Sequence, residues 1–438
     1  HGPAPDRGVY KSTDGGTTWK KTLYVDENTG CADLSMDMTN PRILYAAMWD
    51  HRRLPWQVIS GGKGSGLYKS VDGGETWSKI QEGLPKELGK MSVSVCRSNP
   101  EKVYALVESD TQKEQGGLFV SNNGGKSWDR ISKDHRLVQR AWYYIEVFAD
   151  PQNEEIVYVL NSPGLKSVDG GKSWEYLRTG HGDYHQLWIN PRNNKNIIIS
   201  DDGGATITVN NGLTWSSQNN QPTAQFYRVN TDNLFPYRVY GGQQDNTSVM
   251  IESRNPSGWA ISDHNWNSSA GGESAFIAFN PDDPRYTMGG SYQGTIELLD
   301  QKTNEGKGVM ISPIQYQALQ PKNMKYRFNW NAPIIWSKHD NAFYHGGNKL
   351  FRTTNLGKSW EVISPDLTRN DESKLGISGV PYTNEGAGGE NYGTLSYVKD
   401  SPNEKGVIWT GSDDGFVHVT RDGGKTWTNV TPAGLQEC

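Results

Sequence analysis

An eight-residue phrase, Ser/Thr-x-Asp/Asn-x-Gly-x-Ser/Thr-Trp, constrains the fold of this chain more than any other feature, because the chain repeats it seven times. The first copy spans residues 12–19. The later copies span residues 70–77, 121–128, 167–174, 208–215, 353–360 and 420–427. Self-similarity of this kind is typical of a repeat architecture, in which each repeat is one small structural unit that packs against its neighbours.

Each copy, which we call a clasp, predicts a tight hairpin turn. The carboxylate or amide at its third position can accept hydrogen bonds from backbone donors of the turn, and glycine supplies the positive φ that the turn requires. The Thr or Ser then restarts a strand, and the Trp buries a large ring against a neighbouring repeat. The acids of the clasps are therefore predicted to be structural.

The sequence around each clasp predicts a unit of four strands. An apolar alternation leads into an Asn-Pro or Asp-Pro turn, followed by a Val-Tyr-type strand, a Gly-rich loop and a third strand that enters the clasp. Units of roughly forty to sixty residues with this pattern are typical of propeller blades. Clasps are missing between residues 210 and 355, but two further units fit at 226–251 and 276–299.

Eight blades and a fraction are predicted by this count. Residues 1–19 supply only the last two strands of a blade, so we expect the chain to be a fragment or a mature chain completed by other sequence. The composition, with 50 Gly, 16 Trp and 21 Tyr in 438 residues, fits an all-β protein rich in turns.

The charge pattern excludes two classes of partner. The net charge of -5 comes from interspersed signs without a basic stripe, so nucleic acid and anionic membranes are not expected partners. No apolar run approaches the roughly 20 residues that span a bilayer. A carbohydrate or protein ligand remains the expected partner.

Functional residues are expected in the loops on the face opposite the clasps. Acids stand just before the predicted first strand of several blades, at Asp33, Asp183, Glu273 and Glu390. The loops between the second and third strands add further acids flanked by glycine, which lets a ligand approach the backbone closely: Asp201, Asp202, Asp245, Asp413 and Asp414.

The densest chemistry lies in two segments, 181–186 and 140–144, which combine an acid between two imidazoles with a run of aromatic rings. Rings that stack on sugars, together with a protonated and an ionised carboxyl, are the requirements of glycoside hydrolysis. We therefore predict catalytic roles for Asp183 and Glu273, with Asp33 or Asp245 as substitutes. The predicted substrate-binding residues are Trp142, Tyr143, Tyr144, His181, His185, Gln243, Gln244, Asp245 and Asn246.

Several alternatives stay open for these residues. The acids can cap loop amides, and Trp142 or Tyr144 can belong to the core. The spacing of His181, Asp183 and His185 also permits zinc, and the acidic loops permit structural calcium. We expect no cofactor and no catalytic metal. A serine nucleophile is not expected either, because the Gly-x-Ser-x-Gly at 62–66 has no helix to follow it.

The clasps resemble the Asp-box, or BNR repeat, shared by sialidases, sortilin-type receptor domains and the xyloglucanases of glycoside hydrolase family 74. The segments 24–30, 140–144, 216–227 and 363–371 are similar to large bacterial Asp-box proteins usually labelled glycosyl hydrolase or sortilin-like. This likeness extends over essentially the whole chain.

The resemblance implies an all-β fold of four-stranded blades in two tandem seven-bladed β-propellers, of which this chain is a central portion. Residues 1–218 would then be the C-terminal blades of a first propeller, with an incomplete first blade, and residues 219–438 the blades of a second. A single ten-bladed ring is the alternative. The resemblance also implies an extracellular or periplasmic location and the remaining blades of a longer polypeptide as partners.

For function, the resemblance implies a secreted glycan-active hydrolase that uses paired carboxylates on the loop face. The alternative is a non-catalytic, sortilin-like propeller that binds proteins, peptides or polysaccharide. A family 74 enzyme requires two facing aspartates, for which Asp33 and Asp183 are candidates. A sialidase requires an arginine triad, with Arg140, Arg228 and Arg327 as candidates, but the Arg-Ile-Pro motif expected near its start is missing.

Overall fold

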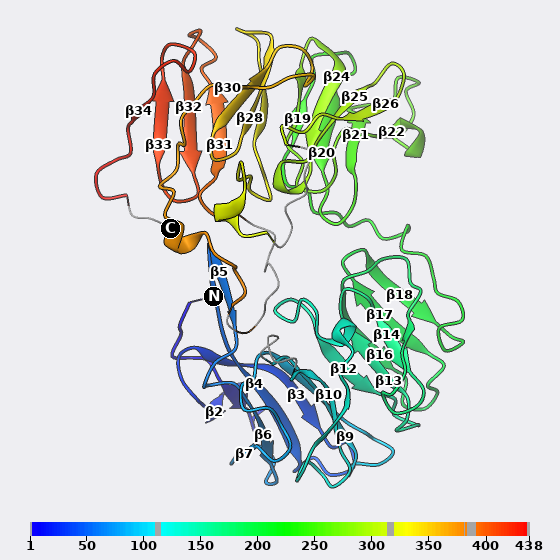
Figure 1. The fold of residues 1–438 in the computed structure, drawn as a ribbon. Coiled ribbons are helices and arrows are strands. Elements are labelled where there is room, and N and C mark those ends of the chain that lie inside the picture. The colour runs from blue at the N-terminus through cyan, green and yellow to red at the C-terminus, as the bar shows by residue number, and fades with distance from the viewer. Residues whose placement is uncertain (1, 110–114, 313–318, 381, 383–390, 436–438) are drawn as a thin grey trace. The chain divides into compact units, whose positions relative to one another are not determined.

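A computed structural model describes residues 2–109, 115–312, 319–380, 382 and 391–435 and is drawn as a ribbon in Figure 1. The regular structure of these residues consists of nine antiparallel sheets and contains no α-helix. Helical turns occur only as short 3-10 segments, namely η1 (His135–Leu137), η2 (Asp263–Asn265), η3 (Tyr292–Gly294), η4 (Pro321–Asn323) and η5 (Glu372–Lys374). The predicted all-β class with four-stranded sheets is confirmed.

The chain divides into two compact units after Pro222, and the described residues of Gly379–Ala387 group with the first unit. Whether these units belong to two separate propellers, as the division at residues 218 and 219 predicts, stays a prediction. No helix in the described part of the chain is long and apolar enough to cross a membrane.

The first unit begins with a hairpin of two strands and continues with four sheets in chain order. The hairpin pairs β1 (Val9–Lys11) with β2 (Lys20–Leu23). The sheets contain β3 (Thr29–Met36), β4 (Leu44–Leu54), β6 (Gly66–Ser70) and β7 (Ser78–Ile80), with β5 (Gln57–Ser60) paired to β4; β8 (Met91–Val95), β9 (Val103–Val107), β10 (Gly117–Ser121) and β11 (Asp129–Ser132); β12 (Glu146–Ala149), β13 (Val157–Leu160), β14 (Leu165–Ser167) and β15 (Glu175–Tyr176); and β16 (Tyr184–Ile189), β17 (Ile197–Asp201) and β18 (Gly204–Thr208).

The second unit contains four sheets of four strands, again in chain order. Its strands are β19 (Asn230–Thr231), β20 (Arg238–Gly242), β21 (Ser248–Glu252) and β22 (Trp266–Ser268); β23 (Ile277–Asn280), β24 (Asp283–Gly290), β25 (Ile296–Asp300) and β26 (Glu305–Gly308); β27 (Ile334–Ser337), β28 (Ala342–Gly346), β29 (Leu350–Thr353) and β30 (Glu361–Val362); and β31 (Leu395–Asp400), β32 (Ile408–Ser412), β33 (Val417–Thr420) and β34 (Thr428–Asn429).

The described sheets match the predicted count of eight blades and a fraction, and the fraction is the β1–β2 hairpin. The two blades predicted without clasps are the sheets β19–β22 and β23–β26. One sheet departs from the pattern, because β16–β18 has three assigned strands. The segment after its clasp still pairs with β18, since the Ser216 N–H donates to the Ile207 carbonyl at 2.9 Å.

Five of the seven clasps join the third and fourth strands of a sheet, as predicted, and the first clasp joins the two strands of the β1–β2 hairpin. In the first clasp, the Asp14 carboxylate accepts from the Thr18 N–H at 2.9 Å and from the Thr18 hydroxyl at 2.6 Å. These hydrogen bonds from Thr18 lower the pKa of Asp14 to about 2. Gly15 and Gly16 have φ values of 71° and 92°, which an L side chain adopts only with strain.

Clasp tryptophans pack against the sheet that precedes their own sheet in the chain. Trp128, which is 3% exposed, packs with Tyr45 and Leu67 of the preceding sheet. The indole N–H of Trp427 likewise donates to the Ile363 carbonyl, just past β30 of the preceding sheet, at 3.0 Å. The ring of Trp19, in the first clasp, is 62% exposed.

The first strands of successive sheets in the first unit are linked side by side by polar side chains. The Ser92 hydroxyl on β8 accepts from the Val147 N–H on β12 at 3.0 Å. The Asp33 carboxylate on β3 accepts from the Val93 N–H on β8 at 2.9 Å. These contacts align the ends of the first strands and so position the loops that enter them.

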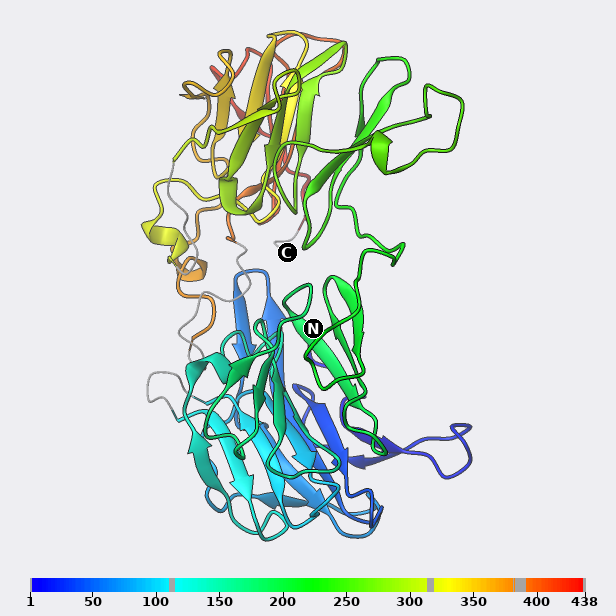
Figure 2. The same cartoon turned by 90° about the vertical axis from the view of Figure 1, so that its right-hand side faces the viewer.

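The hairpin formed by the far end of β4 and by β5 extends beyond the rest of its sheet, as both views of the ribbon show (Figures 1 and 2). It carries His51, Arg53 and Val58, and the sequence pattern predicted no such extension. Residues 62–65, which follow, form a loop that leads into β6, and Ser65 is buried and accepts the Asp50 N–H at 3.0 Å. Ser65 therefore has the structural role expected from the sequence.

Candidate functional site

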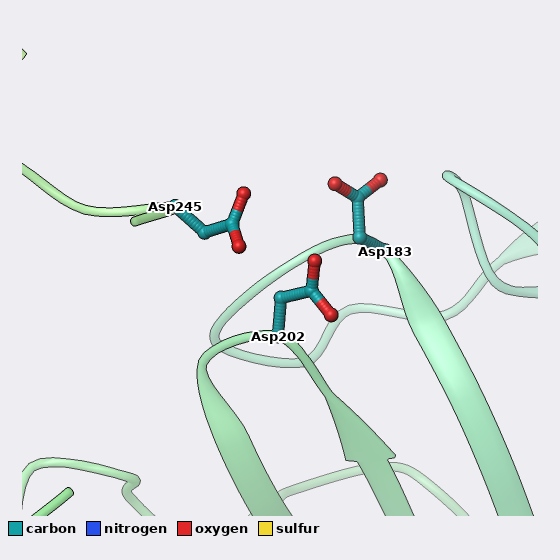
Figure 3. Close-up of side chains that lie close together, drawn as sticks. All are labelled: Asp183, Asp202 and Asp245. Carbon is teal, nitrogen blue, oxygen red and sulfur yellow. The ribbon is translucent and has the colours of Figure 1, made fainter. Parts of the chain in front are cut away.

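Two carboxylates lie together at one edge of the sheet β16–β18. Asp183 directly precedes β16, and Asp202 lies in the turn between β17 and β18 (Figure 3). Because β16 and β17 are antiparallel, with Tyr184 opposite Asp201, the start of one strand lies beside the end of the other. A carboxylate oxygen of Asp183 therefore lies within 4.8 Å of one of Asp202.

His185 is the first basic side chain beside this pair, and it is cationic when its imidazole is protonated. Its Nε2 is hydrogen-bonded to the Asp202 carboxylate, and this bond raises the pKa of the imidazole. The side chain is 49% exposed, so a ligand can reach it. Its ring centroid lies 5.4 Å from that of Tyr144.

Arg140 is the second cation at the site. Its Nη1 lies 3.8 Å from the Asp183 carboxylate, and its guanidinium lies 5.3 Å from the ring centroid of Tyr144. Arg140, Ile145 and Asp183 all have positive φ values, of 50°, 66° and 58°. Such a backbone costs about 1–3 kcal/mol per residue and clusters at functional sites. The surrounding structure thus holds both members of this ion pair in strained positions.

Glu146, the first residue of β12, is a carboxyl group that titrates near neutral pH. Burial is the main cause that raises its pKa to about 7, and the Asp33 charge adds to the rise, while Lys90 and His185 oppose it. Its Oε2 is buried and has no hydrogen-bond partner among the described residues. The Lys90 ammonium donates to the Tyr144 carbonyl at 2.7 Å.

Glu146 was missed by the sequence analysis, although the signal was there. It stands at the start of the first strand of its sheet, which is the position that singled out Asp183 in the next sheet. The run of aromatic residues just before it, 142–144, is the stronger sequence pattern in this segment.

We expect Glu146→Gln to flatten the dependence of stability on pH. In the wild type the folded-state pKa of about 7 lies above the ordinary pKa of a glutamate side chain, 4.5. The folded state therefore binds more protons between these values, and stability falls as the pH rises from about 4.5 to 7. Thermal midpoints of the two proteins are measured by circular dichroism from pH 5 to 8. The midpoint of the variant minus that of the wild type should increase as the pH rises. Parallel curves would contradict the raised pKa.

Side chains of the β4–β5 hairpin lie next to the aromatic residues 142–144 in the first unit. Trp142 packs against Val58, and the Arg53 guanidinium lies 5.4 Å from the Tyr143 ring centroid. Trp142 is only 7% exposed, and Tyr144 is also buried. Their predicted contact with substrate stays a prediction, and the Tyr144 ring packs beside His185 of the acid site.

The imidazole of His181 contacts the backbone of its own loop. Its Nδ1 is 2.9 Å from the Gly182 carbonyl. Within the described residues, the potential metal-ligand atoms of His181 and His185 do not form a group with Asp183. The zinc set considered from the spacing is therefore not assembled, whereas calcium at the acidic loops stays untested.

Asp33 was predicted to lie just before a strand, but its position in the structure is different. It lies inside β3, at an irregularity in the pairing with β4 after Cys31. Its Oδ2 accepts from the Ser92 hydroxyl at 2.5 Å and from the Val93 N–H at 2.9 Å. The carboxylate thereby joins β3 to β8, and its predicted catalytic role has no support from this geometry.

The remaining predicted residues lie in the second unit. Glu273 accepts from the Asp245 N–H at 2.6 Å, so its carboxylate holds the loop between β20 and β21. The backbones of Gln243, Gln244 and Asn246 make hydrogen bonds within this loop or to Gln225. The catalytic role predicted for Glu273 stays a prediction, and Glu390 lies outside the described residues.

In the second unit, the side chains of Asp413 and Arg327 make hydrogen bonds to other residues of the same unit. Burial raises the pKa of Asp413 to about 6, and its carboxylate accepts from the Thr394 N–H at 2.9 Å. Arg327 is buried and donates to the Gly393 carbonyl and to Asp366, at 3.1 and 3.0 Å. Arg327 is therefore not available as a member of an arginine triad.

Comparison with known proteins adds evidence on relationship. The chain is 28% identical to a probable oligoxyloglucan-reducing end-specific xyloglucanase from Neosartorya fischeri, over 40% of this chain and 23% of that protein. It is 21% identical to a xyloglucanase from a Paenibacillus species, over 97% of this chain and 45% of that protein. This chain has distant xyloglucanase relatives. It spans less than half the length of these curated proteins, and no family model matches it.

Two solved structures align over most of this chain with low sequence identity and low TM-scores. The family 74 xyloglucanase from Xanthomonas campestris is 13% identical, with 99% of this chain and 77% of that chain covered and a TM-score of 0.39. A structure of YCF48 bound to D1 peptide is also 13% identical, with 91% and 92% covered and a TM-score of 0.32.

Proposed function

We propose that this chain is part of a glycan hydrolase that cleaves a polysaccharide of the xyloglucan class at the acid site of the first unit. The observation that carries the proposal is the pair Asp183 and Asp202, whose carboxylate oxygens lie within 4.8 Å at the rim of one sheet. The distant xyloglucanase relatives support the class of substrate.

The surroundings of the pair supply what hydrolysis of a glycosidic bond requires. One group must hold a proton for the leaving oxygen while another stays ionised. Arg140 pairs with Asp183, since its Nη1 lies 3.8 Å from that carboxylate. Glu146, with a pKa of about 7, keeps its proton in about half of the molecules at pH 7 and in most of them below it, and His185 lies within electrostatic reach of it. We assign the ionised role to Asp183 and the proton store to Glu146.

The test is to incubate the protein with xyloglucan, with unsubstituted β-1,4-glucan and with an α-linked glucan, and to measure released reducing ends. We expect release from xyloglucan and none from the α-glucan. Absence of release from all three polymers at pH 5 to 8 would overturn the proposal.

A non-catalytic role is favoured by one specific observation. Asp33, Asp201 and Glu273 use their carboxylates to hold the protein's own backbone or side chains, as expected of a binding propeller. In that case the protein would be retained on immobilised xyloglucan without releasing reducing ends. The tandem arrangement of seven-bladed propellers, a location outside the cytoplasm and the further blades of a longer polypeptide remain part of the proposal.

A further inference from the structure

A groove of about 540 Å³ crosses the first strands of all four sheets of the second unit. Its walls include residues of β19, β23, β27 and β31, among them Ile277 and Val398. This volume lies within the range of small-ligand sites, which is about 300–1,000 Å³. The groove belongs entirely to the second unit, so its lining is independent of the acid site described above.

Arg228 is a partly buried cation in the wall of this groove. Its guanidinium lies 3.8 Å from the centroid of the Phe276 ring, which covers one face of it. Arg228 forms no ion pair with any residue that the structure describes. Burial lowers the pKa of the guanidinium, yet an arginine stays charged at neutral pH. A partly desolvated charge without a carboxylate partner is unfavourable until an anion neutralises it.

The charge of the groove is opposite to that of the whole chain. Lys338 and Lys399 add two exposed cations to its lining, and Asp400 is the one carboxylate among the described lining residues. The complete sequence has a net charge of -5, so this local excess of positive charge does not follow from composition. Charge complementarity therefore selects an anionic ligand.

Aromatic rings define the rest of the surface. Trp336 is partly exposed in the groove, and Tyr397 on β31 is 57% exposed. Such rings present a flat apolar face with a polar edge, which suits the alternating apolar and hydroxylated surfaces of a sugar ring. Cations beside exposed rings thus combine contacts for a carboxylate and for a pyranose.

We propose that this groove binds an acidic oligosaccharide, with a uronate carboxylate on Arg228 and neighbouring sugar rings on Trp336 and Tyr397. Lys338 and Lys399 then contact further carboxylates along the same oligosaccharide. This binding site goes beyond the proposed hydrolase, because it requires no reaction and none of the acids of the first unit.

Isothermal titration of the full chain with an oligomer of galacturonic acid tests the proposal, with a cello-oligosaccharide of equal length as the neutral ligand. We expect binding of the acidic oligomer, weakened about tenfold or more by Arg228→Gln because a charged hydrogen bond is lost. Arg254→Gln is the matched control, because Arg254 is exposed in the same unit, 5.8 Å from the Phe235 ring centroid. That variant should bind like the wild type.

A second variant covers the case in which Arg228→Gln does not fold. Lys338→Gln combined with Lys399→Gln changes only exposed side chains and should weaken the same binding while leaving the thermal midpoint unchanged. No binding of galacturonate oligomers, or equal binding of the neutral oligomer, would overturn the proposal. Equal binding of an oligo-glutamate would also overturn it and would assign the groove to acidic peptides. None of these outcomes depends on release of reducing ends from xyloglucan.

Discussion

Replacing Trp128 by alanine is expected to destabilise the first unit by about 3–5 kcal/mol, the range for removal of a large buried ring. The ring is 3% exposed and packs with Tyr45 and Leu67 of the preceding sheet, so its loss opens a cavity between two sheets. The measurement is chemical denaturation of the wild type and the variant, followed by tryptophan fluorescence.

Trp19→Ala is the matched control, because Trp19 has the same position in its clasp but is 62% exposed. We expect this variant to lose much less stability than Trp128→Ala. Equal losses from the two substitutions would show that the tryptophan acts within its own turn, and would contradict the packing of one sheet on another as its main role.

Replacing Asp183 by asparagine is expected to lower the rate of xyloglucan cleavage by about 10²–10⁴-fold, the usual contribution of a group that takes part in proton transfer. The substitution keeps the shape of the side chain and removes the charge that faces Arg140. The fold should change little, because only part of the contacts of this loop come from the carboxylate. The rate of reducing-end release and the thermal midpoint are measured on the same preparations.

Asp169→Asn is the matched control for loss of a carboxylate in the same unit. Asp169 lies in a clasp, where its carboxylate accepts the Ser173 N–H at 2.9 Å, and three other clasps carry asparagine at this position. We expect normal cleavage by this variant. Retained activity in Asp183→Asn would remove Asp183 from the catalytic site, and a large fall in its stability would assign it a structural role instead.

Most of the fold was predictable because its signals are local. The hydrogen bonds of a clasp lie within eight residues. The residue types at fixed positions of this eight-residue pattern therefore reveal every turn of this kind. The β4–β5 hairpin gave no comparable signal, because His51–Leu54 simply continue a strand past the edge of its sheet. The missing fourth strand of the sheet β16–β18 was also unexpected, because its clasp sequence is complete.

The candidate site was predictable only in part, since it depends on contacts between sheets. Asp183 was found from its place before a strand, but pairing it with Asp202 required the register of β16 and β17. The raised pKa of Glu146 depends on burial and on Asp33 and Lys90, which come from two other sheets. Likewise, only the three-dimensional structure shows that Asp33 is bound by Ser92.

The backward direction of the tryptophan contacts has a consequence for synthesis of the protein. Apart from the exposed Trp19, each ring packs against a sheet whose sequence leaves the ribosome earlier. A sheet with such a clasp therefore meets a finished docking surface as soon as the clasp has been translated. Folding can then advance with translation, one sheet at a time, as in other chains whose repeats contact only their neighbours. Ribosome-bound chains that stop after successive clasps should accordingly gain protease-resistant sheets stepwise, from the N-terminal end onward.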